Sequence, residues 1–358
     1  MQELSRFVLT ALVGAAVGAL SFGVAAQAQD LEEINVISPN DSTCGVYPQW
    51  NADVFGFWAD SGVEVNILPS ETTVPYVAFL QNGDADLVML DSAQVLQAAD
   101  NDLPIAVVYE AYNYAPDGIY VVADSPIQGL ADLQDMTVGL SSDRDLITTV
   151  IAIDSVGATL DGNNITTVVV GDSGPVMASA MRDGTIDALA GSNADYAGMQ
   201  AAGIDIRDIT PPEVLRNPGN SWTAWGPTLE ENREKIAGFL RGWAMAQHGG
   251  VVDTKLTASA CRTQVPEEFE NLETGLGLVT QNVYVQQLRR TKDYGELQPD
   301  VWESIQGTYV KLDEISQEIP PDNFLDASFI EAANNWTLDQ VKAGMAKWKE
   351  ENPDKVIN

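Results

Sequence analysis

The chain has 358 residues, of which 45% are hydrophobic and 20% charged, so it contains enough apolar material for about two domains. Its 52 acidic residues outnumber the 18 lysines and arginines and give a formal net charge of −34. Such a protein would repel nucleic-acid phosphates and anionic membrane surfaces, and we expect neither as a partner. An acidic surface suits saline surroundings, where salt screens like charges, so we attribute the acidity to habitat and not to a ligand.

The scarcity of cations and nucleophiles excludes most catalytic machinery. The first lysine is Lys235, so no Walker-type phosphate loop and no Schiff-base lysine precedes it. The single histidine, His248, would have to serve any serine triad or histidine-containing zinc site. We interpret His248 as a cation near the end of a helix that stops at Gly249-Gly250. No catalytic residue, cofactor or metal site is predicted.

The N-terminus has the pattern of a secretory signal. Arg6 precedes an apolar stretch over residues 7–26, and Ala26-Gln27-Ala28 forms an A-x-A cleavage site. We predict export and cleavage after Ala28, with a membrane anchor as the alternative. Because an oxidising compartment allows disulfides, Cys44 and Cys261 are predicted to pair; two separate buried thiols are the alternative.

In chain order, short strands alternate with helices and then give way to helices alone. Strands are predicted at residues 34–38, 63–68, 86–90, 105–109, 119–122, 137–140, 165–170, 186–190 and 204–206. Helices are predicted between them at 48–61, 73–82, 92–100, 145–155, 176–182 and 195–202, and later at 229–247, 283–288, 302–315 and 337–349. The alternation indicates an α/β fold with parallel sheets covered by helices. We expect one lobe from residues 29–117 plus 221–358 and a second from residues 118–220.

Three segments resemble periplasmic solute-binding proteins of ABC importers. They are residues 83–92 (GDADLVMLDS), 124–139 and 180–188, and they are most similar to the nitrate, sulfonate, taurine and thiamine-pyrimidine-precursor branch. Gln134 and Met136 stand where that family usually has lysines. The resemblance implies a type II periplasmic-binding-protein fold with an interlobe cleft and C-terminal helices. It also implies a periplasmic monomer without enzymatic activity that delivers a small molecule to an ABC permease in the inner membrane.

Ligands of parallel sheets bind beyond the carboxyl ends of the strands, so we place the candidate ligand contacts in those loops. Helix capping is the alternative role of the Asp91-Ser92 and Ser141-Ser142-Asp143 segments. Tyr112, Tyr114 and Trp222 could clamp a ring or a methylated amine. The predicted ligand-binding residues are Thr43, Tyr47, Thr72, Asp91, Ser92, Glu110, Tyr112, Tyr114, Ser141, Ser142, Asp143, Arg144, Asp172, Asn193 and Trp222.

The charges at these strand ends bear on the ligand. Arg144 is the one arginine in a predicted cleft loop, whereas carboxylates follow several strands, at Asp91, Glu110, Asp143 and Asp172. We therefore favour a heteroaromatic or amine-bearing solute over a sulfonate-like anion. The alternatives are a ligand-binding sensor module and an enzyme resembling the pyrimidine synthases of related fold. The lack of a lysine before Lys235 argues against the enzyme.

Overall fold

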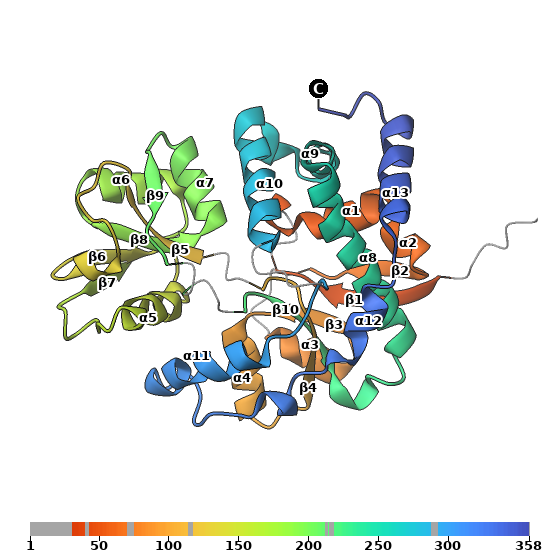
Figure 1. Ribbon diagram of the computed structural model, residues 1–358, viewed down its shortest axis with the longest axis horizontal. Coiled ribbons are helices and arrows are strands. Elements are labelled where there is room, and N and C mark those ends of the chain that lie inside the picture. Colours follow the sequence, from red (N-terminus) through yellow and green to blue (C-terminus); the bar gives the residue numbers. More distant parts are fainter. Residues whose placement is uncertain are drawn as a thin grey trace, which may run out of the picture. The chain divides into compact units, whose positions relative to one another are not determined.

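The computed structural model describes residues 31–39, 43–69, 75–113, 117–211, 214, 218–287 and 293–357 (Figure 1). The predicted signal peptide, Thr72 and Tyr114 lie outside these residues, and of Asn193 only the backbone is described.

The first sheet is built by two separate stretches of the chain. Its order is β2-β1-β3-β10-β4. The strands are β1 (Glu32–Ile37), β2 (Val63–Ile67), β3 (Leu87–Leu90), β4 (Ile105–Glu110) and β10 (Ser221–Trp225). β1 runs parallel to β2 and β3, and β10 lies antiparallel between β3 and β4. All residues of β3 and β4 are buried, as expected for strands covered on both faces.

The second sheet has the same plan and is formed by one continuous stretch. Its order is β7-β6-β8-β5-β9. The strands are β5 (Asp117–Val122), β6 (Thr137–Leu140), β7 (Thr166–Val169), β8 (Ala188–Ser192) and β9 (Ile206–Asp208). β6 is parallel to β7 and β8, whereas β5 is antiparallel to β8 and β9.

Both sheets are therefore mixed. The prediction of a parallel sheet is wrong for β5, and β10 is a strand that is missing from the predicted set. Each of these strands is the first that the chain forms after leaving the other sheet. The chain leaves a sheet at the carboxyl edge and enters the next one at the same edge, so the entering strand runs in the opposite direction. Both connecting segments lie together, since Tyr112 N donates to Asn220 O and Gly219 N donates to Tyr112 O.

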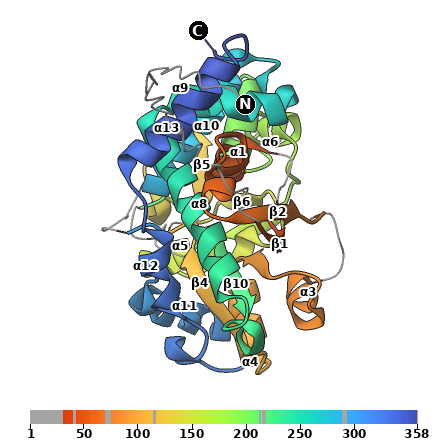
Figure 2. The same cartoon turned by 90° about the vertical axis from the view of Figure 1, so that its right-hand side faces the viewer.

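Helices cover both faces of the first sheet. One face carries Met89, Tyr109 and Trp222 and packs against α1 (Tyr47–Val54), α2 (Phe57–Asp60), α8 (Arg233–Val252), α12 (Ile330–Ala333) and α13 (Leu338–Glu351). The other face carries Val88, Leu90 and Val107 and packs against α3 (Tyr76–Asn82), α4 (Ser92–Asp100) and α11 (Pro299–Lys311). Helices α12 and α13 lie along α8 (Figure 2). Within the described part of the chain, none of the helices is long and apolar enough to cross a bilayer.

The second sheet is covered in the same way by shorter helices. The core on one face contains Ala152 and Ile153 of α5 (Asp145–Ser155). The core on the other face contains Met177 and Met181 of α6 (Gly174–Arg182) and Met199 of α7 (Asn193–Ala201). Each sheet thus has a core on both of its faces, and the ends of its strands remain free to present side chains.

His248 lies inside α8 and does not end it, so its interpretation as a cation at a helix terminus is wrong. The helix continues through Gly249-Gly250 to Val252. A Cβ atom on Gly250 would lie 2.6 Å from the ring of Tyr47, so glycine is needed here for close packing. The Nδ1 atom of His248 lies 2.9 Å from the hydroxyl of Tyr294.

A disulfide joins Cys44 to Cys261 of α9 (Thr254–Gln264), with their Cα atoms 6.0 Å apart. Both cysteines are fully buried, in a cluster that includes Val279 of α10 (Leu272–Gln287). Beside the bridge, Thr43 Oγ1 and Cys44 N donate to the carboxylate of Glu268 at 2.6 and 2.9 Å. The bridge therefore connects the start of the first sheet's stretch to the helices that follow β10.

We expect the double variant Cys44→Ala/Cys261→Ala to lose about 2–4 kcal/mol of free energy of unfolding, because the bridge closes a long loop in the unfolded chain. Guanidinium unfolding of the oxidised protein, the reduced protein and the variant measures this difference. The reduced protein and the variant should agree with each other. An unchanged unfolding midpoint in both would contradict a stabilising bridge.

Candidate ligand-binding site at the strand ends

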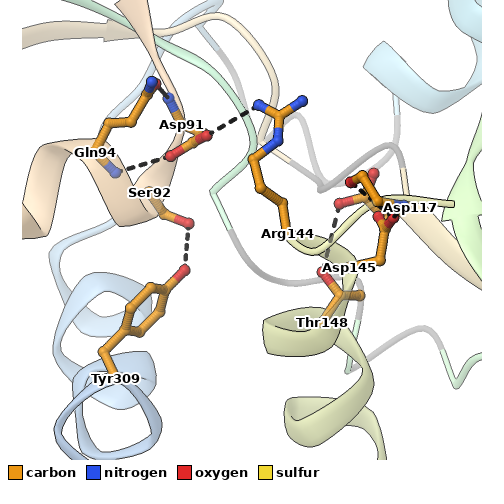
Figure 3. A network of polar contacts seen from close by, with 9 residues as sticks. Asp91, Ser92, Gln94, Asp117, Arg144, Asp145, Thr148 and Tyr309 are labelled. Carbon is orange, nitrogen blue, oxygen red and sulfur yellow. Dashed lines mark hydrogen bonds and ion pairs between the residues drawn. The ribbon is translucent and has the colours of Figure 1, made fainter. Parts of the chain in front are cut away.

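Loops from the two sheets meet at Arg144. This residue follows β6 in the second sheet, and its Nη1 atom lies 3.6 Å from Oδ2 of Asp91, which follows β3 in the first sheet. Figure 3 shows the Arg144 side chain pointing toward Asp91, with Asp117 and Asp145 on its other side. Carboxylates from three different strand ends therefore lie near Arg144, and Asp91 is the one that pairs with its guanidinium group.

Asp91 is positioned by the helix that it caps. Gln94 N donates to Asp91 Oδ1 at 2.8 Å, and Asp91 N donates to the Gln94 side chain at 3.1 Å, which makes a reciprocal capping box at the start of α4. Burial raises the pKa of the Asp91 carboxyl, and the bonds from Gln94 and the charge of Arg144 oppose that rise. The second oxygen of this carboxylate is the one that faces Arg144.

Ser92, the next residue, faces α11 and not the other sheet. Its Oγ atom lies 2.7 Å from the hydroxyl of Tyr309, and both side chains are buried. Figure 3 shows this pair immediately below the Asp91 loop. The contact holds the loop after β3 against α11.

The loop after β6 is organised by Asp145, a residue absent from the sequence-based predictions. Its Oδ2 atom accepts from Ser141 Oγ, Ser142 N and Ser142 Oγ at 2.8, 2.6 and 3.0 Å. The same arrangement recurs after β8, where Ser192 N and Ser192 Oγ donate to Asp195. The repeated Ser-x-x-Asp spacing after two strands was the signal available in the sequence.

Asp117 also belongs to this cluster and was not predicted. It begins β5 opposite Ser192, and Thr148 Oγ1 lies 3.5 Å from its Oδ2 atom. Burial, followed by the negative charge of Asp145, raises the pKa of Asp117 to about 7, although Arg144 lowers it. A carboxyl that titrates near neutrality beside other charged groups is a common feature of functional sites. From the sequence, this position marks only the predicted boundary between the two lobes.

Trp222 is not at the mouth of a cleft, and the prediction that it clamps a ligand is wrong. Its side chain is fully buried and makes edge-to-face contacts with Phe239 and Trp243 of α8, at centroid distances of 4.8 and 5.1 Å. Tyr47 is also fully buried, and its hydroxyl donates to the carbonyl of Gln247 at 3.1 Å. Large aromatic side chains bury so much apolar surface that the core retains them even close to a strand end.

Glu110 is the last residue of β4, at the same edge of the first sheet, but its carboxylate has a structural role. Its carboxylate is fully buried and accepts from Gln298 N, Gln298 Nε2 and Trp302 Nε1 at 2.8, 2.8 and 2.9 Å. Asn113 Nδ2 donates a fourth bond at 3.2 Å. These bonds attach the end of β4 to the beginning of α11.

The other predicted residues are dispersed. Thr43 binds Glu268, and the buried Tyr112 donates its hydroxyl to the carbonyl of Gly45 at 2.9 Å. Asp143 and Asp172 are exposed after β6 and β7, and the backbone of Asn193 begins α7. The structure thus brings together Asp91, Arg144 and the loop of Ser141 and Ser142. In the described stretches of chain, no group of three or more histidine, cysteine or acidic residues is arranged to hold a metal ion.

Comparison with solved structures identifies the class of fold. The periplasmic aliphatic sulphonate binding protein SsuA from Escherichia coli matches with a TM-score of 0.62 and 15% identity, over 82% of this chain and 91% of that one. A putative periplasmic sulfonate-binding SsuA protein from Methylobacillus flagellatus matches with a TM-score of 0.66 and 14% identity, over 88% and 96%. The desulfurization enzyme DszB matches with a TM-score of 0.57 and 15% identity, over 85% and 99%. The chain has the fold of periplasmic binding proteins, which at least one enzyme also uses.

The family follows from the sequence itself. Residues 46–248, more than half of the chain, match the model of the NMT1/THI5-like family, and the chain belongs to that family. No curated protein matches it.

The raised pKa of Asp117 predicts a dependence of stability on pH. An ordinary aspartate in the unfolded chain ionises near pH 4, whereas the folded protein retains this proton to about pH 7. The unfolded state is therefore favoured progressively as the pH rises from about 4 to about 7, and the penalty is constant above that range. Relative to wild type, Asp117→Ser should gain stability over this interval and have its largest advantage at pH 8. Serine is preferred because an asparagine before Gly118 would revert to aspartate by deamidation.

Thermal unfolding of both proteins between pH 4 and pH 8 tests this expectation. The exposed Asp143 provides the matched control, since Asp143→Ser removes a carboxylate from the protein surface and not from a buried position. A difference between Asp117→Ser and wild type that does not vary with pH would contradict the raised pKa.

Proposed function

We propose that this protein is the substrate-binding component of an ABC importer, which captures a small organic solute between two lobes and passes it to a permease in the inner membrane. The observation that carries the proposal is the meeting of strand-end loops from both sheets at Asp91, Asp117, Arg144 and Asp145. A solute held there would contact both sheets at once. Membership of the NMT1/THI5-like family and the likeness in fold to sulfonate-binding proteins support this role.

The proposed lobes are residues 29–117 plus 221–358 and residues 118–220. Two connections run between them, and the hydrogen bonds of Tyr112 to Gly219 and Asn220 keep these connections side by side. Motion about such a pair requires changes in only a few backbone angles, which is how hinged binding proteins close on a ligand. The predicted signal peptide supports a periplasmic location for this activity, and we propose that the protein works as a monomer.

The charge of the site favours a solute with a cationic amine. Arg144 is already paired with Asp91, and Asp117 and Asp145 lie close enough to interact electrostatically with each other. An ammonium group entering this cluster would gain carboxylate partners, whereas a sulfonate would meet their repulsion and compete for the one guanidinium. The sulfonate-binding relatives in fold make a sulfonate the second candidate.

We further propose that the protein catalyses no reaction. Although the enzyme DszB shares the fold, both cysteines of this chain are engaged in the disulfide, so no thiol is free to act as a nucleophile. The side chain of His248 lies beside Tyr294 and Trp336, with ring centroids 5.9 and 5.0 Å away. A sensor that captures the same solute for a different membrane partner is the alternative function.

The test is a binding screen on the protein without its predicted signal peptide. Protonated and quaternary amines, amine-bearing heteroaromatics, alkanesulfonates, taurine and nitrate are compared by thermal shift in saline buffer and then by calorimetry. A solute present at 100 times its Kd should stabilise the protein by about 2.7 kcal/mol. We expect an amine-bearing compound to bind and to be recovered unchanged. Turnover of that compound would contradict the binding role.

Asp91→Asn separates the two solute classes. Asparagine preserves the helix cap but removes the charge, so binding of an amine should weaken about 10- to 100-fold, as for the loss of a charged hydrogen bond. A sulfonate should bind as well or better. The matched control is Asp124→Asn, which removes an exposed carboxylate that follows β5 at its far end. If Asp91→Asn left the affinity for an amine equal to that of the control, Asp91 would not contact the solute.

A further inference from the structure

Helix α5 of the second sheet is fastened at both ends to elements of the first. At its N-terminal end, Arg144 pairs with Asp91 at 3.6 Å. In its last turn, Asp154 Oδ1 accepts from Lys311 Nζ at 2.9 Å. Between these points Ile147 packs against the core on the α11 side of the first sheet. Two ion pairs thus flank one apolar contact along a single helix.

Lys311 belongs to α11, a helix that packs against the first sheet. Trp302 and Tyr309 of α11 are buried, the first bonded to Glu110 at 2.9 Å and the second lying 2.7 Å from Ser92. Lys311 is the last residue of this helix. The backbone of Lys311 is therefore held in place, and its ion pair with Asp154 favours the position of α5 beside α11.

Few basic side chains are available to offset the electrostatic repulsion between the two bodies, by which we mean each sheet together with the helices that cover it. Residues 117–208 contain 14 aspartates and three arginines. Two of these arginines, Arg182 and Arg207, donate to backbone carbonyls of the same stretch, at Ala202 and at Ala123, Ser125 and Ile127. Arg144 is the third, and it faces the first sheet. Together with Lys311, it places positive charge where two acidic bodies approach each other.

We propose that the Arg144–Asp91 and Lys311–Asp154 pairs form a salt-sensitive latch that holds α5 against α11 and the Asp91 loop, and so sets the balance between open and closed forms of the ligand-free protein. The latch rests on the proposed two-lobe function. Three of its four side chains are accessible, with Arg144 80% exposed, Lys311 52% and Asp154 49%, whereas Asp91 is 26% exposed. Exposed pairs of this kind are weak enough to break reversibly, and each changes an equilibrium by about two- to fivefold.

The experiment measures the distance between the two bodies without any ligand. Spin labels are attached at Glu64→Cys in β2 and Ala131→Cys in the second sheet's body, both exposed positions. The native cysteines do not react, because they are paired. Pulsed electron resonance then gives the distribution of distances in about 0.1 M and 1 M salt, where the Debye length is about 10 and 3 Å.

In 0.1 M salt, the variant Arg144→Gln/Lys311→Gln should shift the ratio of closed to open populations by about 4- to 25-fold toward the open form, if the two pairs act independently. In 1 M salt the variant and wild type should converge. Lys342→Gln/Lys347→Gln removes two positive charges from exposed positions of α13 and is the matched control. It should behave as wild type does at both salt concentrations.

A charge swap provides a second, independent test. Lys311→Asp alone should open the protein, and adding Asp154→Lys should restore the wild-type distribution. The latch is overturned if the glutamine variant matches the control in 0.1 M salt, or if the swap restores nothing. Because no ligand is used, a failed binding screen with an intact latch would count against the proposed function alone, and solute binding without a latch effect would count against the latch alone.

Discussion

A buried carboxylate that has no cationic partner among the described residues organises the junction between the two sheets. Glu110 is fully enclosed at the end of β4, and burial raises the pKa of its carboxyl. Such a group is costly in an apolar interior unless its oxygens accept hydrogen bonds, and four N–H groups from Gln298, Trp302 and Asn113 supply them. These donors belong to the start of α11 and to the segment that leaves the first sheet. The position of α11, and with it the contacts of Tyr309 and Lys311, therefore depends on this one side chain.

At the carboxyl edges of the sheets, the same acidic residues both cap helices and give the candidate site its charge. Asp91 and Asp145 cap or order the beginning of a helix, where the free N–H groups favour negative charge. Asp91 also pairs with Arg144, and Asp145 acts electrostatically on Asp117, so their structural role also creates the electrostatic field that a solute would meet. Capping and ligand contact, which the sequence presents as alternatives, are compatible here because a carboxylate has two oxygens. In Asp91, one oxygen serves the helix and the other faces the opposite sheet.

The order of strands and helices could be predicted from the sequence because apolar runs and glycine punctuation report local structure. The direction of β5 could not, since alternating side chains look the same in a strand that runs either way. The strand β10 was missing from the prediction altogether. Asp91 and Arg144 were found at the site because both lie in loops that follow predicted strands. Asp117 precedes its strand, and its place at the site follows from the reversed direction of β5. Trp222 was misplaced because the strand that contains it, β10, was not predicted, and its side chain lies on the face of the sheet that α8 covers.

The disulfide constrains the order of events in the folding of the protein. Cys44 and Cys261 are separated by 217 residues, and all strands of the second sheet lie between them. A chain made or exported from its N-terminus first must carry Cys44 as a lone thiol until the 217 residues up to Cys261 have followed it. No other cysteine exists with which it could mispair within the chain. Closure of the bridge is therefore a late event that reports a single correct topology, and a backbone cut anywhere in the second sheet would leave the two fragments covalently joined.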